Sequence, residues 1–345
     1  MKIALVHNQI DIRDSADARD VLVQADAITK SLDALGHRHC TLSCNLNLGA
    51  VCKQLQDERP DLVFNLVEDL DGHGRLIHLF PALLDAMRIP YTGSPTESIF
   101  LSSHKTLAKQ IMQQNDLPTP CWQGDKPHLK APEKSAKLDK PTKWIIKSLW
   151  EHASLGLNAD SVIETGSSQA LAAEIARRGP TLGGSCFAEE FIEGREFNLS
   201  LLDSGNGPQV LPPAEIIFQD YTPDMIRIID YQAKWEEESF GYNNTVRSFD
   251  FTAENTKLLN TLTMLARKSW QVFGLKGYAR VDFRVDSKGR PFILEVNANP
   301  CLSPDAGYAA ALQQVGIPFD EAVAHIISSA IAVQSESTLL QSRKR

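Results

Sequence analysis

Two runs of alternating apolar and polar residues near the C-terminal end of the chain carry a high density of charged and amide side chains. The runs cover residues 278–286 and 291–297, and the intervening Ser287-Lys288-Gly289-Arg290 has the composition of a turn. We therefore expect a β-hairpin whose four-residue loop places Asp286 opposite Pro291.

The polar side chains of this hairpin should share one face. Side chains alternate between the two faces of a strand, so Arg280 and Asp282 lie on the same face of the first strand. Glu295 and Asn297 are related in the same way on the second strand. Counting back from the turn sets Asp282 opposite Glu295 and Arg280 opposite Asn297.

Two carboxylates that face each other across a hairpin repel, which disfavours this arrangement as mere structure. A hard divalent cation removes the conflict, because Mg²⁺ binds carboxylate and amide oxygens together with substrate phosphates. Asp282, Glu295 and Asn297 are therefore candidate ligands of Mg²⁺ (or Mn²⁺). Arg280 beside them is a candidate to bind a phosphate or a developing oxyanion. The alternative is a solvated polar face that holds no ligand.

These residues resemble the metal-binding end of D-alanine–D-alanine ligases, which belong to the ATP-grasp superfamily. The resemblance rests on R-V-D-F at 280–283 and E-V-N-A-N-P at 295–300. Six segments earlier in the chain also resemble family segments, and they occur in the same order as in the family: I-P-Y-T-G-S (89–94), His104-Lys105, W-I-I-K (144–147), Ser154-Leu155-Gly156, E-E-F-I-E-G-R-E (189–196) and D-Y-Q-A-K-W (230–235). It implies a ligase that uses ATP and Mg²⁺ to join a small-molecule carboxylate to an amine.

The resemblance implies contacts to the ATP phosphates. Lys105 and Lys147 would place positive charge on them, and Ser154 and Gly156 would belong to a loop whose backbone N–H groups approach them. The chain has no Walker A or G-x-G-x-x-G pattern, as expected where ATP is held between two sheets. The alternative for the two lysines is an ordinary surface position.

The resemblance also implies contacts to the nucleoside. Glu189 would accept a hydrogen bond from the adenine amino group, while the backbone at Glu190 and Ile192 would contact the ring edge. Glu196 would bind the ribose hydroxyls. The alternative for these acids is a negatively charged edge strand.

The implied reaction has two steps. The substrate carboxylate attacks the γ-phosphate in line and gives an acyl phosphate, and the amine then attacks the acyl carbon. Arg280 would stabilise the tetrahedral oxyanion, and Lys234 would bind a carboxylate or phosphate. Ser154 completes the candidate catalytic set through its place in the phosphate loop.

The chain departs from the family where the first substrate binds. The family has a triad of a glutamate in an early glycine-rich loop, a serine and a tyrosine. Residues 7–20 lack that loop, and Ala153 and Trp235 stand at the serine and tyrosine positions. We therefore expect an altered first-substrate subsite, in which Glu68 could hold an amine and Ser303 a carboxylate. For Glu68, an exposed loop acid is an equal alternative.

The order of the remaining elements indicates an α/β and α+β protein of the ATP-grasp fold. Strand, helix and strand patterns at 3–7, 17–35 and 61–68 open a parallel sheet. The expected domains are an N-terminal α/β domain (1–103), a central α+β subdomain (104–188), a C-terminal antiparallel α+β subdomain with the metal site (189–333), and a frayed polar tail (334–345). Residues 123–143 are expected to form an exposed loop.

Composition limits the other functions. The net charge of -8 disfavours a nucleic-acid partner, and no apolar run is long enough to span a bilayer, so we expect a cytoplasmic protein without a membrane partner. The six cysteines contain no C-x-x-C pair, which disfavours zinc or a disulfide framework. Two alternatives stay open, an ATP-grasp kinase for a small acceptor and a nucleotide-binding regulatory module. The resemblance also makes a homodimer one option.

Overall fold

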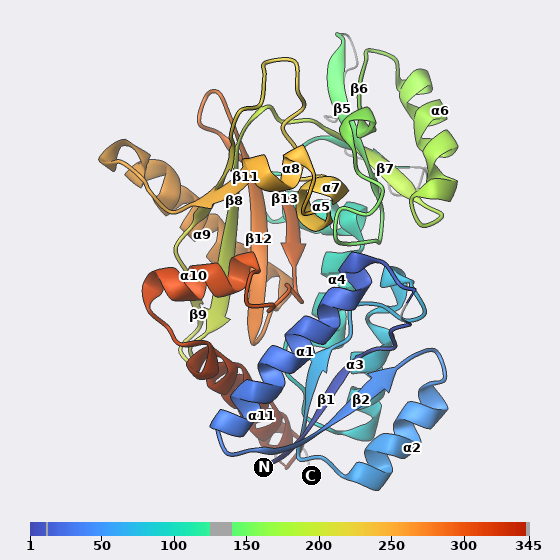
Figure 1. Cartoon of the computed structure of the whole chain (residues 1–345), viewed down its shortest axis with the longest axis vertical. Helices are drawn as coiled ribbons and strands as arrows, with labels where there is room; N and C mark the ends of the chain where they lie inside the picture. The colour runs from blue at the N-terminus through green and yellow to red at the C-terminus, as the bar shows by residue number, and fades with distance from the viewer. Residues whose placement is uncertain (12, 125–139, 343–345) are drawn as a thin grey trace.

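The computed structural model describes residues 1–342 except Ile12 and residues 125–139. Its strands form three sheets, of three, four and six strands. Figure 1 shows the three-stranded sheet at one end of the molecule, the six-stranded sheet above it, and the four-stranded sheet beside the top of the latter. Along the chain the three-stranded sheet comes first, the four-stranded sheet second and the six-stranded sheet last.

The N-terminal sheet is parallel, with strand order β2-β1-β3, as the sequence pattern predicts. Strand β1 is buried on both faces, because Ile3 and Leu5 pack toward α1 while Ala4 and Val6 pack toward α2 and α3. The elements are β1 (Lys2–Asn8), α1 (Ala16–Ala34), β2 (Arg38–Cys44), α2 (Leu48–Glu58), β3 (Leu62–Leu66), α3 (Leu79–Met87) and α4 (Thr96–Ser103).

The central sheet is antiparallel, with strand order β4-β7-β5-β6. Helix α6 covers it through Leu171 and Ile175, which pack on Trp144 and Ile146. Its elements are β4 (Trp122–Gly124), β5 (Thr142–Ser148), β6 (Val162–Thr165), α6 (Ser168–Arg178) and β7 (Cys186–Glu190). The ends of the predicted loop 123–143 thus lie in strands β4 and β5, and residues 125–139 lie outside the described part of the chain.

The C-terminal sheet has the path β11-β10-β8-β12-β13, with β9 paired to β8. Helices α5 and α9 pack on its apolar face, where Phe197, Val281 and Phe283 are fully buried. The elements are α5 (Lys105–Gln114), β8 (Gly194–Asp203), β9 (Pro208–Val210), β10 (Ala214–Phe218), α7 (Tyr231–Trp235), α8 (Phe240–Asn244), β11 (Thr245–Ser248), α9 (Thr256–Phe273), β12 (Tyr278–Asp286), β13 (Pro291–Asn297), α10 (Gly307–Val315) and α11 (Phe319–Ser342).

The turn between β12 and β13 differs from the predicted one. Val285, and not Asp286, pairs with Pro291, so the loop comprises residues 286–290. The reason is that Asp286 closes the loop itself: its Oδ1 accepts hydrogen bonds from the backbone N–H groups of Lys288 and Arg290.

A β-bulge restores the predicted register beyond the turn. Phe283 pairs with Ile293 and Asp282 with Glu295, so Leu294 is the extra residue on β13. The predicted pairing of Asp282 with Glu295 is therefore confirmed, although the turn is one residue longer than predicted. The longer turn shifts the register by one residue, and the bulge at Leu294 shifts it back.

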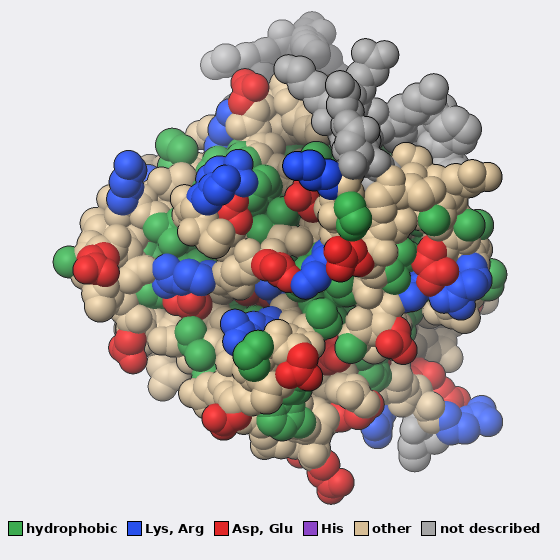
Figure 2. Space-filling model, turned by 90° about the horizontal axis from the view of Figure 1, so that it is seen from above, with side chains coloured by type: hydrophobic (Ala, Val, Ile, Leu, Met, Phe, Trp, Pro, Cys, Tyr) green, Lys and Arg blue, Asp and Glu red, His purple; other side chains and the backbone are tan. Residues whose placement is uncertain are grey.

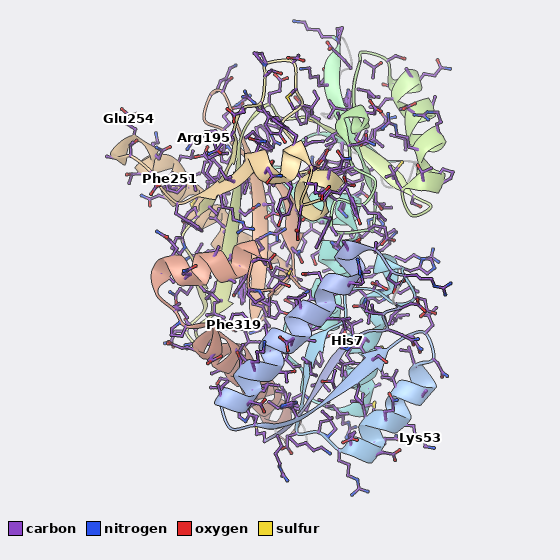
Figure 3. All side chains as sticks on the ribbon, viewed as in Figure 1. His7, Lys53, Arg195, Phe251, Glu254 and Phe319 are labelled. Carbon is purple, nitrogen blue, oxygen red and sulfur yellow. The ribbon has the colours of Figure 1, made fainter. Side chains whose placement is uncertain are left out.

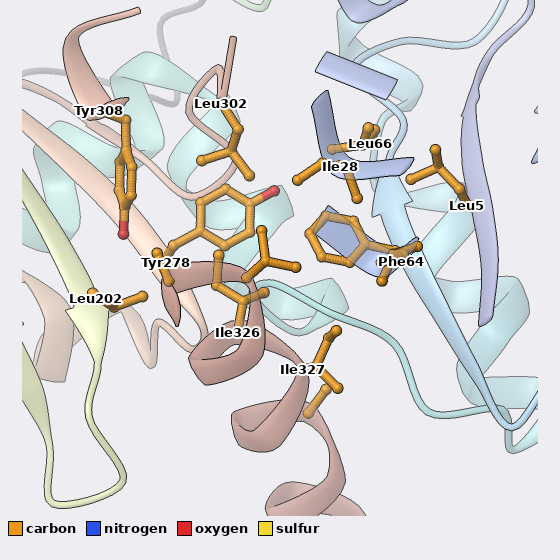
Figure 4. Packing of buried hydrophobic residues seen from close by; sticks show 14 of the residues in the cluster. Leu5, Ile28, Phe64, Leu66, Leu202, Tyr278, Leu302, Tyr308, Ile326 and Ile327 are labelled. Atoms are coloured by element: carbon orange, nitrogen blue, oxygen red, sulfur yellow. The ribbon is translucent and has the colours of Figure 1, made fainter. Parts of the chain in front are cut away.

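The C-terminal helix α11 packs against elements of the N-terminal domain. Ile326 and Ile327 of α11 lie in one core with Ile28 of α1 and Phe64 of β3 (Figure 4), and Tyr278 of β12 belongs to the same cluster. The helix runs to Ser342, so the described backbone is helical over most of the predicted polar tail. The N-terminal and C-terminal sheets therefore share a core.

No single helix within the described residues is long and apolar enough to cross a membrane. Among the helices that the structure describes, α10 and the first part of α11 pass that test as a pair, which is bent by 106°.

Candidate active site

A cavity of about 710 Å³ lies between the central and C-terminal sheets. Most of the side chains predicted from the sequence line it: Lys105, Lys147, Ser154, Glu189, Glu190, Ile192, Glu196, Lys234, Arg280, Asp282, Glu295 and Ser303. Gly156, Asn297 and Glu68 lie outside the lining. The fold therefore brings residues from five separate stretches of the chain to one cavity.

Arg280 lies between the two facing carboxylates of the hairpin. Its Nε and Nη2 donate to Asp282 Oδ1 and Oδ2 at 2.7 and 2.8 Å, and Nη2 is 3.8 Å from Glu295 Oε1. Burial alone would lower the pKa of Arg280, but Asp282 and Glu295 outweigh that effect and raise it. The guanidinium is thus a permanent cation with one side directed to Asp282 and another to Glu295.

The two carboxylates differ electrostatically. Burial raises the pKa of Asp282, although Arg280 acts in the opposite direction. Burial would also raise the pKa of Glu295, but the surrounding cations, led by Lys105 and Arg280, lower it to about 2. Glu295 is therefore ionised at neutral pH and available as a ligand for a further cation.

The donor set for a metal is small. Within the described ranges, no three His, Cys, Asp or Glu side chains converge to hold a metal ion by themselves. Asp282, Glu295 and the amide of Asn297 are the oxygen donors at this point of the hairpin, and Asn297 Oδ1 already accepts from the backbone N–H of Asn299 at 2.9 Å. Such a set fits a hard cation that takes its other ligands from phosphates and water.

Lys105 begins helix α5 and reaches into the cavity. Its ammonium donates to the carbonyl of Glu151 at 2.7 Å, and only 9% of the residue is exposed. Burial lowers the pKa of Lys105 to about 8, and Lys147 adds to the effect. The side chain of Glu151 accepts from the backbone N–H of Gly74 at 3.0 Å, so this residue also joins the central subdomain to the N-terminal one.

Glu189 on β7 lies between two lysines. Its Oε1 is 2.5 Å from Lys147 Nζ and its Oε2 is 2.6 Å from Lys109 Nζ. Burial would raise the pKa of Glu189, but Lys109 and Lys147 lower it. The carboxylate is therefore an ionised acceptor even though its side chain is only 1% exposed.

Glu196 on β8 forms a buried ion pair that the sequence did not reveal. Its Oε2 is 2.7 Å from Arg284 Nη2. Arg284 also donates to the carbonyl of Arg227 and lies over the ring of Phe191, 5.5 Å from its centroid. The predicted ribose-binding carboxylate thus has a fixed cationic partner beside it.

The predicted phosphate loop has an irregular backbone. Ala153, Ser154 and Gly156 have φ values of 60°, 61° and 70°. Ser154 Oγ donates to the carbonyl of Ile229 at 2.9 Å, and Trp235 Nε1 donates to the carbonyl of Ala153 at 3.1 Å. A Cβ on Gly156 would meet Leu182 Cδ2 at 2.5 Å, so both the positive φ and this close contact favour glycine here.

The opposite end of the cavity is acidic. Asp20 of α1 lines it and accepts from Ser303 Oγ at 2.9 Å and from Cys301 Sγ at 3.0 Å. Glu68 accepts from Gln24 Nε2 at 2.8 Å, and burial raises the pKa of Glu68 to about 7. Ser303 therefore lies at the cavity as predicted, with its hydroxyl turned to Asp20, whereas Glu68 lies behind the lining.

The region of the missing family triad has its own contacts. Tyr231 of α7 donates its hydroxyl to Asp17 of α1 at 2.8 Å. Together with the contact of Trp235 to Ala153, it ties α7 to the N-terminal domain and to the phosphate loop. Asp17 therefore places a carboxylate in the first turn of α1, although this stretch lacks the glycine-rich loop of the family.

Sequence reasoning gave no role to Lys109, Arg284, Asp20 and Asn198, whose Nδ2 donates to Asp282 at 2.8 Å. A signal existed for two of them. Lys109 follows Lys105 by one helical turn on the same face of α5, and Arg284 shares the strand face of Arg280 and Asp282. Asp20 carried no signal, because only the fold sets α1 against the loop that holds Ser303.

The chain is similar to known ligases along most of its length. The family model described as D-ala D-ala ligase C-terminus matches residues 126–328. D-alanine–D-alanine ligase of Albidiferax ferrireducens is 31% identical over 238 residues, covering 68% of this chain and 63% of the relative. That of a Synechococcus strain is 28% identical over 319 residues, covering 92% and 90%.

Among solved structures, D-alanine–D-alanine ligase of Bacillus anthracis, determined with ATP, superposes with a TM-score of 0.72 at 17% identity. The alignment covers 98% of this chain and 99% of that one.

These findings confirm the predicted fold class. A cavity between two antiparallel sheets, behind an N-terminal parallel sheet, defines an ATP-grasp protein. The family match covers more than half of the chain, and the chain belongs to the D-alanine–D-alanine ligase family of carbon–nitrogen ligases.

Proposed function

We propose that the cavity binds ATP with Mg²⁺ (or Mn²⁺) and joins the carboxylate of a small amino-acid-like molecule to an amine through an acyl phosphate. One observation carries the proposal: Arg280, Asp282 and Glu295 share the cavity with two lysines from the facing elements, the buried Lys105 and the partly exposed Lys147. Positive groups for phosphates and negative groups for a cation thus lie in one enclosed space, as phosphoryl transfer requires.

Asp282, Glu295 and Asn297 would hold the divalent cation. When bound, the cation neutralises charge on the phosphates during transfer. Lys105 and Lys147 bind phosphate oxygens, and the loop at Ser154 closes over them through its left-handed backbone. Residues of two sheets thereby orient the γ-phosphate toward the substrate carboxylate.

The second step depends on Arg280 and Lys234. Arg280 presents a fixed guanidinium to the oxygen that becomes negative when the amine attacks the acyl carbon. Lys234 also lines the cavity. Its pKa is lowered mainly by burial and further by the positive charge of Arg280. It binds a carboxylate or phosphate of the reacting species. Water is kept from the acyl phosphate by the enclosure of the cavity.

The first-substrate subsite is altered relative to the D-alanine-binding one. Two observations support this: Trp235 donates to the Ala153 carbonyl, and the acidic end of the cavity is formed by Asp20 with Ser303. The acidic end favours a substrate that carries an ammonium group. Ser303 belongs to this end of the cavity as a lining residue. Glu68 contributes indirectly, by accepting a hydrogen bond from Gln24.

The proposed partners are small molecules. Acidic and basic side chains are interspersed on the face seen in Figure 2, and this lack of a uniform basic surface there supports small substrates over nucleic acid. The family resemblance extends the proposal to a homodimer, which light scattering coupled to size-exclusion chromatography would measure.

An ADP-release screen with ATP, Mg²⁺ and pooled D- and L-amino acids and dipeptides tests the proposal, with mass analysis of the products. We expect an amide product and one ADP per amide. ADP together with a phosphorylated acceptor and no amide would identify a kinase instead. Formation of D-alanyl-D-alanine at the highest rate in the pool would show that the subsite is not altered.

A further inference from the structure

Lys109 is as deeply buried as Glu189, yet it does not line the cavity. It is 1% exposed, and its Nζ contacts Glu189 Oε2 at 2.6 Å and Thr119 Oγ1 at 2.9 Å. A buried ammonium without a partner is strongly unfavourable, so the position is stable only because Glu189 is there.

Glu189 is held from two sides that are not equivalent. Lys147 is 17% exposed and lines the cavity, so its ammonium can contact a ligand as well as Glu189. Lys109 is 1% exposed and does not line the cavity. When phosphates occupy the cavity they compete with Glu189 for Lys147, whereas the contact with Lys109 persists.

We infer that Lys109 is a positioning residue that holds Glu189 as an ionised acceptor and so makes the cavity select a nucleobase with an exocyclic amino group. The inference rests on the proposed nucleotide site. An ionised carboxylate accepts hydrogen bonds and donates none. It stabilises a 6-amino purine and repels the carbonyl oxygen of a 6-oxo purine.

The charged groups around Glu189 support this assignment. Lys105 and Lys109 face it from α5, Lys147 faces it from β5, and Glu295 of β13 acts on these lysines. Three cations against two carboxylates keep Glu189 ionised. Thr119 anchors Lys109 in turn, because its hydroxyl donates to the carbonyl of Ile293 at 2.8 Å while it accepts from Nζ.

Calorimetric titration of the full chain with Mg-ADP and Mg-IDP, which differ in the base at position 6, tests the inference without a second substrate. The wild type should bind ADP about tenfold or more tighter than IDP, the effect of one charge-assisted hydrogen bond. Lys109→Met should weaken ADP binding about tenfold and leave IDP binding within about twofold. Thr119→Val keeps the charge and should shift the ratio in the same direction by a smaller factor.

Lys53→Met is the matched control, since Lys53 is exposed on α2 at the far end of the molecule (Figure 3) and should leave both affinities unchanged. Equal weakening of ADP and IDP in a folded Lys109→Met protein, or an unchanged ratio, would overturn the inference. If Lys109→Met does not fold, an unchanged ratio in Thr119→Val overturns it. A wild type that binds neither nucleotide refutes the proposed function itself.

Discussion

The two ends of the cavity are built in different ways. The end that we propose to bind the nucleotide is formed by strands β5, β7, β8, β12 and β13, and its charges form ion pairs, as Asp282 does with Arg280 on the same strand. The acidic end is formed by the first turns of α1 and by the loop that holds Cys301 and Ser303. Sheet geometry fixes the first, whereas helix packing and loop conformation set the second. Substrate preference can therefore change without disturbing the chemistry.

The largest effect is expected at the nucleotide end. Arg280→Lys should lower kcat by about 100-fold or more, because lysine keeps the charge but not the forked contact to Asp282. Steady-state ADP release measures it. The melting temperature should stay within a few degrees of the wild type, and a kcat within about threefold of wild type would remove Arg280 from the chemistry.

The phosphate loop gives the next effect. Gly156→Ala should lower kcat/KM for ATP by about 10- to 100-fold, because φ is +70° and the new Cβ would meet Leu182 Cδ2 at 2.5 Å. Gly184→Ala is the control, since φ is +87° there but nothing lies within 4 Å of the Cβ. If both variants lose activity equally, backbone strain and not the position of the loop is responsible.

The charge of Lys105 should make ATP use depend on pH. Burial lowers its pKa to about 8, so the ammonium is present below pH 8 and is lost as pH rises through that value. We expect kcat/KM for ATP to fall about tenfold per pH unit above this point, because kcat/KM reports groups of the free enzyme. Lys105→Arg should shift the decline to higher pH, and a wild-type profile that is flat to pH 10 would contradict the assignment.

The acidic end should respond in a different kinetic constant. Asp20→Asn removes the negative charge that accepts from Ser303 and Cys301. It should raise KM for the amine-bearing substrate about tenfold and leave KM for ATP unchanged, consistent with the loss of one charged hydrogen-bond acceptor. If KM for ATP changes as well, the two ends of the cavity are not independent.

The smallest effect is expected at the core that both ends share. Tyr278→Phe removes the hydroxyl that donates to Asn299 Oδ1 at 2.7 Å in a fully buried position. The free energy of unfolding should fall by about 1–2 kcal/mol, measured from urea denaturation. Tyr242→Phe, at an exposed tyrosine, is the control and should change it by less than about 0.5 kcal/mol.

The sequence by itself determined the sheets and the polar face of the hairpin. Alternation places Arg280 and Asp282 on one side of a strand whatever else the chain does, because the side-chain period is fixed at two residues. Apolar spacing at Val21, Ile28 and Leu32 determined α1 in the same way, since these residues must meet the sheet. Such local periodicities can be read without knowledge of distant contacts.

Only the tertiary structure decided which charges meet. Lys109 and Glu189 are 80 residues apart, and their 2.6 Å contact exists because the fold brings α5 next to the end of β7. The bulge at Leu294 and the packing of α11 on α1 likewise have no local signal. Which distant segments meet depends on the packing of whole elements, and the side-chain pattern within one segment gives only the face that it buries.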